Sequence, residues 1–220
     1  MSFRIAASPA SALVAPPATA AFWLASVSTF FASIYWVTNQ MTSARSDVGA
    51  AVFQWERAIP FIDWTIIPYG SILAFFVASF FLCRNRAELN CHTARLVAVV
   101  TISVICFVLW PQRFVFERPV VDGALGVLFQ LLSAIDLPYN RTPSLHISVL
   151  VILWVLFAQR THGWMRHAIY AWFALIGVSV LTTYQHHVID IPAGVLAGWL
   201  CVWLFPVSGQ TRLHSRVVRF

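Results

Sequence analysis

Residues 65–83 read TIIPYGSILAFFVASFFLC and contain no charged side chain. A helix needs about 20 predominantly apolar residues to cross the ~30 Å hydrocarbon core of a bilayer. This stretch therefore predicts a membrane-spanning helix. Because the apolar runs of the chain are continuous rather than alternating, we expect an all-α membrane protein with six transmembrane helices. The other five runs are residues 19–38, 95–111, 145–159, 167–185 and 188–206.

The composition supports the same class of protein. Hydrophobic residues make up 60% of the 220 residues, charged residues only 10%, and the mean hydropathy is +0.77. A water-soluble domain carries about a quarter of its residues as charged side chains. The composition therefore excludes a soluble enzyme, a disordered chain and a fibrous repeat. It predicts the bilayer itself as the main partner.

All 14 basic residues are arginine and none is lysine. Mechanisms that need a lysine amine, such as a Schiff base, are therefore excluded. The net charge of +6 does not predict nucleic-acid binding, because the arginines are scattered between apolar runs rather than gathered on one polar face. Any phosphate or carboxylate ligand would have to be bound by arginine.

The arginine distribution predicts the orientation. A cytoplasmic N-terminus places nine arginines inside and five outside, and cytoplasmic segments normally carry the excess. We therefore expect both termini to be cytoplasmic. The inside set is Arg4, Arg84, Arg86, Arg95, Arg160, Arg166, Arg212, Arg216 and Arg219, and the outside set is Arg45, Arg57, Arg113, Arg118 and Arg141. The expected organisation is a disordered cytoplasmic tail over 1–18, a six-helix membrane domain over 19–206 and a basic cytoplasmic tail over 207–220.

Two polar clusters fall on the predicted outer side, and the first ends in RTPSLH, residues 141–146. Thr142 is a good N-cap and Pro143 a good first helical residue, so a helix should begin here with its free N–H groups pointing outward. An anion would be favoured at this end, where Ser144 adds a hydroxyl, Arg141 a guanidinium and His146 a proton donor. The alternative is an ordinary capped helix with an interfacial histidine.

The second cluster is YQHHVID, residues 184–190. On a helix, His186 and Asp190 would share one face, so that the carboxylate holds one ring nitrogen and leaves the other as a free base or nucleophile. By spacing alone, His187 competes for the same role. The alternative is a histidine that only satisfies a buried carboxylate. Zinc is not expected, because the outer side has neither an HExxH motif nor a cysteine ligand.

Earlier in the first cluster, Arg113 and Arg118 flank a short aromatic stretch. Arg118 precedes Pro119 at the outer end of the third apolar run, and it is the better phosphate-binding candidate of the two. The alternative for both residues is an interfacial arginine whose charged end reaches the lipid headgroups.

These motifs together resemble those of the type-2 phosphatidic acid phosphatase superfamily. Its first motif is KxxxxxxRP, its second PSGH and its third SRxxxxxHxxxD. This chain has Arg118-Pro119, then PSLH at 143–146, then Ser179, His186 and Asp190 at the spacing of the third motif. The stretches PYNRTPSLHIS and TTYQHHVID look closest to the branch that includes inositol phosphorylceramide synthase and sphingomyelin synthase.

The chain departs from the family motifs at several positions. The first-motif lysine is missing, and Arg113 stands five rather than seven residues before Arg118. Leu145 replaces the glycine of the second motif, and Val180 replaces the arginine of the third. Arg113 or Arg141 would have to supply the lost phosphate contacts.

By resemblance, His186 would be the nucleophile that forms a phosphohistidine, Asp190 would orient it and His146 would protonate the leaving group. The phosphoryl oxygens would be held by Arg118, Arg141 and Ser144, and the scheme needs no metal or other cofactor. The resemblance implies a metal-independent lipid phosphatase. The arginine distribution places its site on the outer side, and the short loops fit a bacterial chain, so we expect a site at the periplasmic face of a bacterial inner membrane. One alternative is a lipid phosphotransferase that uses the same intermediate, and another is a non-catalytic lipid-binding protein.

Overall fold

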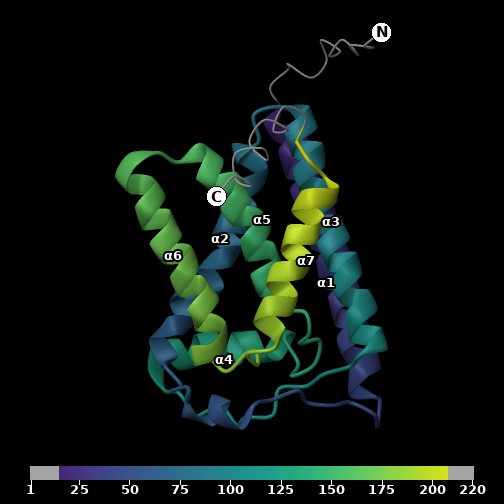
Figure 1. Ribbon diagram of the computed structural model, residues 1–220, viewed down its shortest axis with the longest axis vertical. Coiled ribbons are helices and arrows are strands. Elements are labelled where there is room, and N and C mark those ends of the chain that lie inside the picture. The colour runs from purple at the N-terminus through teal and green to yellow at the C-terminus, as the bar shows by residue number, and fades with distance from the viewer. Residues whose placement is uncertain (1–14, 208–220) are drawn as a thin grey trace, which may run out of the picture.

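A computed structural model of the protein describes residues 15–207, and within them every regular element is a helix (Figure 1). The all-α prediction is confirmed for this part of the chain. Residues 1–14 and the tail from 208 lie outside it, so the two predicted tails are almost entirely outside the described residues. The α-helices are α1 Pro17–Ser43, α2 Ile66–Leu82, α3 Arg86–Leu109, α4 Gly123–Ile135, α5 Leu145–Arg160, α6 Gly163–Thr182 and α7 Asp190–Leu204, with two 3-10 segments, η2 Gln54–Ala58 and η3 Asp63–Thr65.

Each of the six predicted apolar runs is helical, as α1, α2, α3, α5, α6 and α7. Within residues 15–207, four helical stretches are long and apolar enough to cross a membrane: Pro17–Ser43, Asp63–Leu82, Arg86–Leu109 and Gly163–Thr182. Helices α5 and α7 have 16 and 15 residues, which gives about 24 and 22 Å at 1.5 Å per residue. Both are shorter than the hydrocarbon core.

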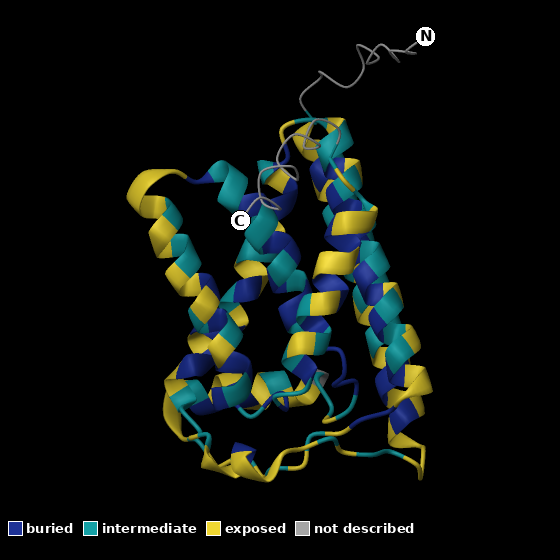
Figure 2. Ribbon diagram, viewed as in Figure 1, coloured by how far each residue is buried: buried dark blue, intermediate teal, exposed yellow. Residues whose placement is uncertain are grey.

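Helix α5 lies at the centre of the bundle and packs against α2, α3, α6 and α7. Both ends of the described chain lie at one end of the bundle, and α4 lies across the opposite end together with the loops (Figure 1). Buried residues gather on the inward faces of the helices, while their outward faces are largely exposed (Figure 2). Exposed tryptophans occur at both ends, as expected at two membrane interfaces: Trp55, Trp64 and Trp110 on the loop side, and Trp164 and Trp203 on the side of the termini.

Two glycines on α7 allow it to lie unusually close to α5. A Cβ atom on Gly194 would lie 2.7 Å from the carbonyl oxygen of Ser144, and one on Gly198 would lie 2.7 Å from that of Ser148. The Ser148 hydroxyl donates to the Gly194 carbonyl at 3.0 Å. Such small-residue contacts are typical of helix packing in membranes. They place the first turns of α5 and α7 side by side.

Replacing Gly198 with alanine is expected to destabilise the protein by about 1–3 kcal/mol, because the new methyl group overlaps the α5 backbone. The matched control is Gly70→Ala in α2, where a Cβ meets nothing within 4 Å. Alanine is the better helix former, so this control should keep or slightly raise the stability. Thermal unfolding of both variants in detergent, followed by circular dichroism, measures the difference. Equal melting temperatures would contradict the close-packing interpretation.

Candidate active site

The start of α5 differs from the prediction. The helix begins at Leu145, and its N-cap is Ser144, whose hydroxyl oxygen accepts the N–H of Ile147 at 3.3 Å. Thr142 is not the cap, because its hydroxyl donates instead to the carboxylate of Asp190. The backbone N–H of Ser144 donates to the Asp190 carbonyl at 3.2 Å. The segment before α5 is therefore fastened to the first residue of α7, a contact that local sequence does not encode.

His186 and Asp190 are in contact, as their spacing suggested, but not along a helix. The Nδ1 atom of His186 lies 3.2 Å from Oδ2 of Asp190. Helix α7 begins only at Asp190, and the pair is formed by the turn that precedes it. There the N–H of Asp190 donates to the His187 carbonyl at 3.0 Å, and the N–H of His187 donates to Oδ2 at 2.9 Å. Within residues 15–207, Nε2 of His186 has no hydrogen-bond partner.

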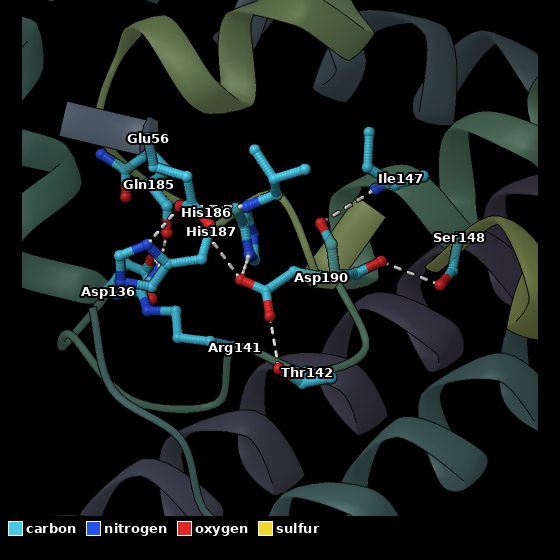
Figure 3. A network of polar contacts seen from close by, with 12 residues as sticks. Glu56, Asp136, Arg141, Thr142, Ile147, Ser148, Gln185, His186, His187 and Asp190 are labelled. Carbon is cyan, nitrogen blue, oxygen red and sulfur yellow. Dashed lines mark hydrogen bonds and ion pairs between the residues drawn. The ribbon is translucent and has the colours of Figure 1, made fainter. Parts of the chain in front are cut away.

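His187 is held differently. Its Nδ1 lies 2.8 Å from Oε2 of Glu56, and its Nε2 accepts the N–H of Val115 at 3.3 Å. The ring also stacks on Phe114 with centroids 4.4 Å apart. Because both of its nitrogens are occupied, His187 lacks the free lone pair that His186 retains. Figure 3 shows that each imidazole contacts its own carboxylate: His186 contacts Asp190, and His187 contacts Glu56.

Glu56 was not among the predicted site residues. It lies in η2, 131 residues before His187, and it is only 2% exposed. Its sequence signal was a carboxylate directly after the aromatic stretch Phe53-Gln54-Trp55, in a chain with eight acidic residues. A carboxylate buried in such a setting normally requires a partner.

Arg141 is buried between the loop after α4 and the loop before α7. Its guanidinium donates to the carbonyls of Gln185 at 2.8 Å and Leu137 at 2.6 Å, and it lies 3.4 Å from Oδ2 of Asp136. Asp136 in turn accepts the hydroxyl of Tyr35 at 2.6 Å. Burial is the largest single influence on Arg141 and lowers its pKa, but Asp136, Tyr35, Tyr69 and Asp190 together outweigh it, so the pKa is raised. Asp136 and the two carbonyls therefore stabilise the positive charge of Arg141.

Arg118 lies at the same end of the bundle. Its guanidinium donates to the Ser133 hydroxyl at 3.0 Å and to the Tyr184 carbonyl at 3.2 Å, and it lies 5.7 Å from the Phe129 ring centroid. Burial lowers the pKa of Arg118, and the positive charge of Arg141 lowers it further. Arg118 and Arg141 donate to the carbonyls of the consecutive residues Tyr184 and Gln185, and two positive charges at one place favour an anion between or beside them.

His146 occupies the first turn of α5 and is half-buried. Its ring stacks on Tyr69 of α2 with centroids 4.2 Å apart and planes 16° apart. Its helix turn is fastened to the His186–Asp190 pair, because the Ser144 N–H donates to the Asp190 carbonyl at 3.2 Å.

Several buried nitrogens in this region lack a partner within the described part of the chain: Nε of Arg118, Nε of Arg141, Nε2 of His146 and Nε2 of Gln185. Buried polar groups are nearly always hydrogen-bonded in native proteins. Unpaired nitrogens that converge from α5 and three loops are therefore the arrangement expected where an anionic ligand binds.

Two residues that were predicted to bind phosphate do not offer an unpaired side-chain group to this cluster. Arg113 is exposed, and among residues 15–207 its side chain has no hydrogen bond or ion pair; only its backbone N–H is engaged, to the Gly49 carbonyl at 2.9 Å. Ser144 is completely buried and its hydroxyl oxygen already caps α5. Arg118, Arg141, His146, His186 and Asp190 form the remaining cluster.

In the described part of the chain, no group of three or more His, Cys, Asp or Glu side chains is placed to hold a metal ion. Comparisons with protein-family models, curated proteins and solved structures find no match to the chain. The geometry of the cluster and the motifs that compose it therefore carry the functional argument.

Proposed function

We propose that this protein is a membrane lipid phosphatase that cleaves a lipid phosphate monoester or pyrophosphate through a phosphohistidine on His186. One observation carries the proposal. The Nδ1 of His186 is held by Asp190 while Nε2 is free, next to two arginines whose buried Nε atoms lack a partner among residues 15–207. An oriented nucleophile beside unpaired cationic donors suits attack on a phosphate ester.

The reaction proceeds in two displacements at phosphorus. The Nε2 lone pair of His186 attacks phosphorus, the bond to the lipid oxygen breaks with its electron pair, and His146 donates a proton to that oxygen. In the second displacement His146 takes a proton from water, the water oxygen attacks phosphorus, and the N–P electron pair returns to Nε2. Inorganic phosphate leaves. Asp190 keeps the proton of His186 on Nδ1 and stabilises the cation that develops on the ring.

Arg118 and Arg141 hold the phosphoryl oxygens while charge builds up on them. Both guanidiniums are pre-oriented by protein carbonyls, so little reorganisation is needed when the substrate binds. The four long apolar helices embed the chain in a membrane, and we infer that α5 and α7 also cross it. Both termini are then cytoplasmic, and the cluster faces the outer side, the periplasm if the membrane is a bacterial inner membrane.

The short lengths of α5 and α7 fit this placement. Both helices begin at the cluster, at Leu145 and Asp190, next to the loops and α4 that cover that end (Figure 1). A lipid phosphate at the membrane interface is therefore within reach of the cluster, while its acyl chains remain in the hydrocarbon region.

A second candidate function is transfer of the phosphoryl-bearing group to an alcohol. Its support is the limited exposure of the cluster, since His186 is 7% and Asp190 1% exposed. A site shielded from bulk water can favour another acceptor over hydrolysis. The two functions share the phosphohistidine and differ only in the acceptor.

One experiment tests both candidates. Purified protein in lipid nanodiscs is incubated with radiolabelled lipid phosphates and pyrophosphates, with and without lipid and polyol acceptors. Free phosphate supports hydrolysis, whereas label in a new lipid supports transfer. If neither product forms from any substrate, the enzyme proposal is wrong and the non-catalytic lipid-binding alternative takes its place.

Replacing Arg118 with glutamine is expected to lower kcat/KM by roughly 10- to 100-fold, because a charge-assisted hydrogen bond to phosphate is lost. Inhibition by inorganic phosphate should weaken in parallel. The matched control is Arg45→Gln at the same end of the bundle, since Arg45 is exposed and pairs with Asp47 at 2.6 Å. Phosphate-release kinetics on both variants measure the effect. Equal losses in the two variants would mean that general surface charge, not the cluster, attracts the substrate.

A further inference from the structure

Glu56 satisfies three N–H donors with one buried carboxylate. Its Oε1 accepts the backbone N–H of Phe53 at 3.0 Å. Its Oε2 accepts the N–H of Val188 at 3.3 Å and lies 2.8 Å from Nδ1 of His187. Glu56 and His187 are each 2% exposed. These contacts join segments that are more than 130 residues apart in the sequence.

The contacts also define the state of the His187 ring. The backbone N–H of Val115 can only donate, so Nε2 of His187 carries the lone pair and Nδ1 carries the hydrogen. That hydrogen is donated to Glu56. The ring is enclosed by Phe114, stacked at 4.4 Å, and Phe116, edge-on at 5.0 Å. His187 thus fastens the segment around Glu56 and the segment around Val115 to the loop before α7.

This second imidazole–carboxylate pair connects directly to the first. The backbone N–H of His187 donates to Oδ2 of Asp190 at 2.9 Å, and the same oxygen lies 3.2 Å from Nδ1 of His186. The position of the His187 backbone therefore sets where the Asp190 carboxylate meets the nucleophilic ring. Figure 3 shows Glu56, His187, His186 and Asp190 together in this network.

We propose that Glu56 and His187 are positioning residues that hold the His186–Asp190 pair in its reactive geometry. The inference rests on the proposed function, because it assigns them a role in the same reaction. Glu56 does not touch the reacting atoms. It acts through His187 in the way that outer hydrogen-bond partners orient the groups of an active site.

The test compares Glu56→Gln with Glu117→Gln, an exposed glutamate on the same outer side. Glutamine keeps the size of the side chain but replaces one acceptor oxygen with an N–H donor, so the three donors can no longer all be satisfied. We expect Glu56→Gln to lower kcat by roughly 10- to 100-fold, with KM changed by less than about 2-fold and slower formation of the phosphohistidine in a single turnover. Glu117→Gln should match the wild type.

A conservative rescue separates positioning from mere folding. In His187→Asn the amide N–H can replace the Nδ1 donor to Glu56, whereas His187→Ala removes it. The asparagine variant should therefore retain more turnover per folded molecule than the alanine variant. If both variants, or Glu56→Gln, lose only folded protein while turnover per folded molecule stays at the wild-type value, the positioning role is overturned.

A second measurement does not depend on activity. Diethyl pyrocarbonate labels imidazole nitrogens that carry a free lone pair, and mass spectrometry locates the label. The wild type should be labelled at His186 and protected at His187, and Glu56→Gln should expose His187. An inactive wild type with this labelling pattern would refute the proposed function alone. Continued protection of His187 in Glu56→Gln would refute the positioning role of Glu56.

Discussion

Replacing His186 with alanine is expected to reduce phosphate release by about 10⁴-fold or more, the usual effect of removing a catalytic nucleophile. The reason is geometric: His186 is the imidazole whose Nδ1 is held by Asp190 while its Nε2 has no partner in the described part of the chain. The measurement pairs phosphate release with trapping of labelled enzyme after brief exposure to a radiolabelled lipid phosphate. The wild type should carry an acid-labile, alkali-stable label, and the variant should carry none.

His187→Ala is the matched control, because it removes an adjacent imidazole from the same loop. Both nitrogens of His187 are already bonded, to Glu56 and to the backbone of Val115. Its loss should therefore slow the reaction by roughly 10- to 100-fold, as for a positioning residue, and the label should still form on His186. If His187→Ala abolished the label and His186→Ala retained it, the nucleophile would be the other histidine.

The helices themselves were predictable because each is encoded by a local property. A run such as residues 65–83 has to be helical once it is in lipid, since its backbone has no other way to satisfy its hydrogen bonds. The helix ends were less predictable. Thr142 has the side chain of an N-cap, yet its hydroxyl is used by Asp190, 48 residues later. Only the tertiary fold brings that competing acceptor to it.

The same distinction applies to the cluster. The spacing of His186 and Asp190 predicted their contact correctly, because a separation of four residues is short enough to meet in a turn as well as in a helix. The partners that hold the cluster come from distant segments: Glu56 from η2, Tyr69 from α2 and Asp136 from the end of α4. A single sequence contains no spacing that could connect them. Arg113 shows the converse, since a motif-like position did not bring its side chain to the cluster.

Replacing His146 with alanine is expected to slow turnover of lipid phosphates by about 10² to 10⁴-fold, the usual contribution of a general acid or base. The proposed role has two parts, protonation of the leaving oxygen and activation of water. Its support is an Nε2 atom without a partner among residues 15–207, on a ring that Tyr69 holds in place by stacking at 4.2 Å. The measurement uses both a lipid phosphate and p-nitrophenyl phosphate, whose leaving group needs no proton.

The two substrates separate the two parts of that role. With p-nitrophenyl phosphate, His146→Ala should release about one nitrophenol per enzyme in a burst and then stall, because phosphohistidine forms but water is not activated. His186→Ala should show no burst at all. Tyr69→Phe, which keeps the stacking, should remain within a few-fold of the wild type. A steady, burst-free release by His146→Ala at the wild-type rate would remove His146 from the mechanism and leave phosphohistidine hydrolysis to another group in the cluster.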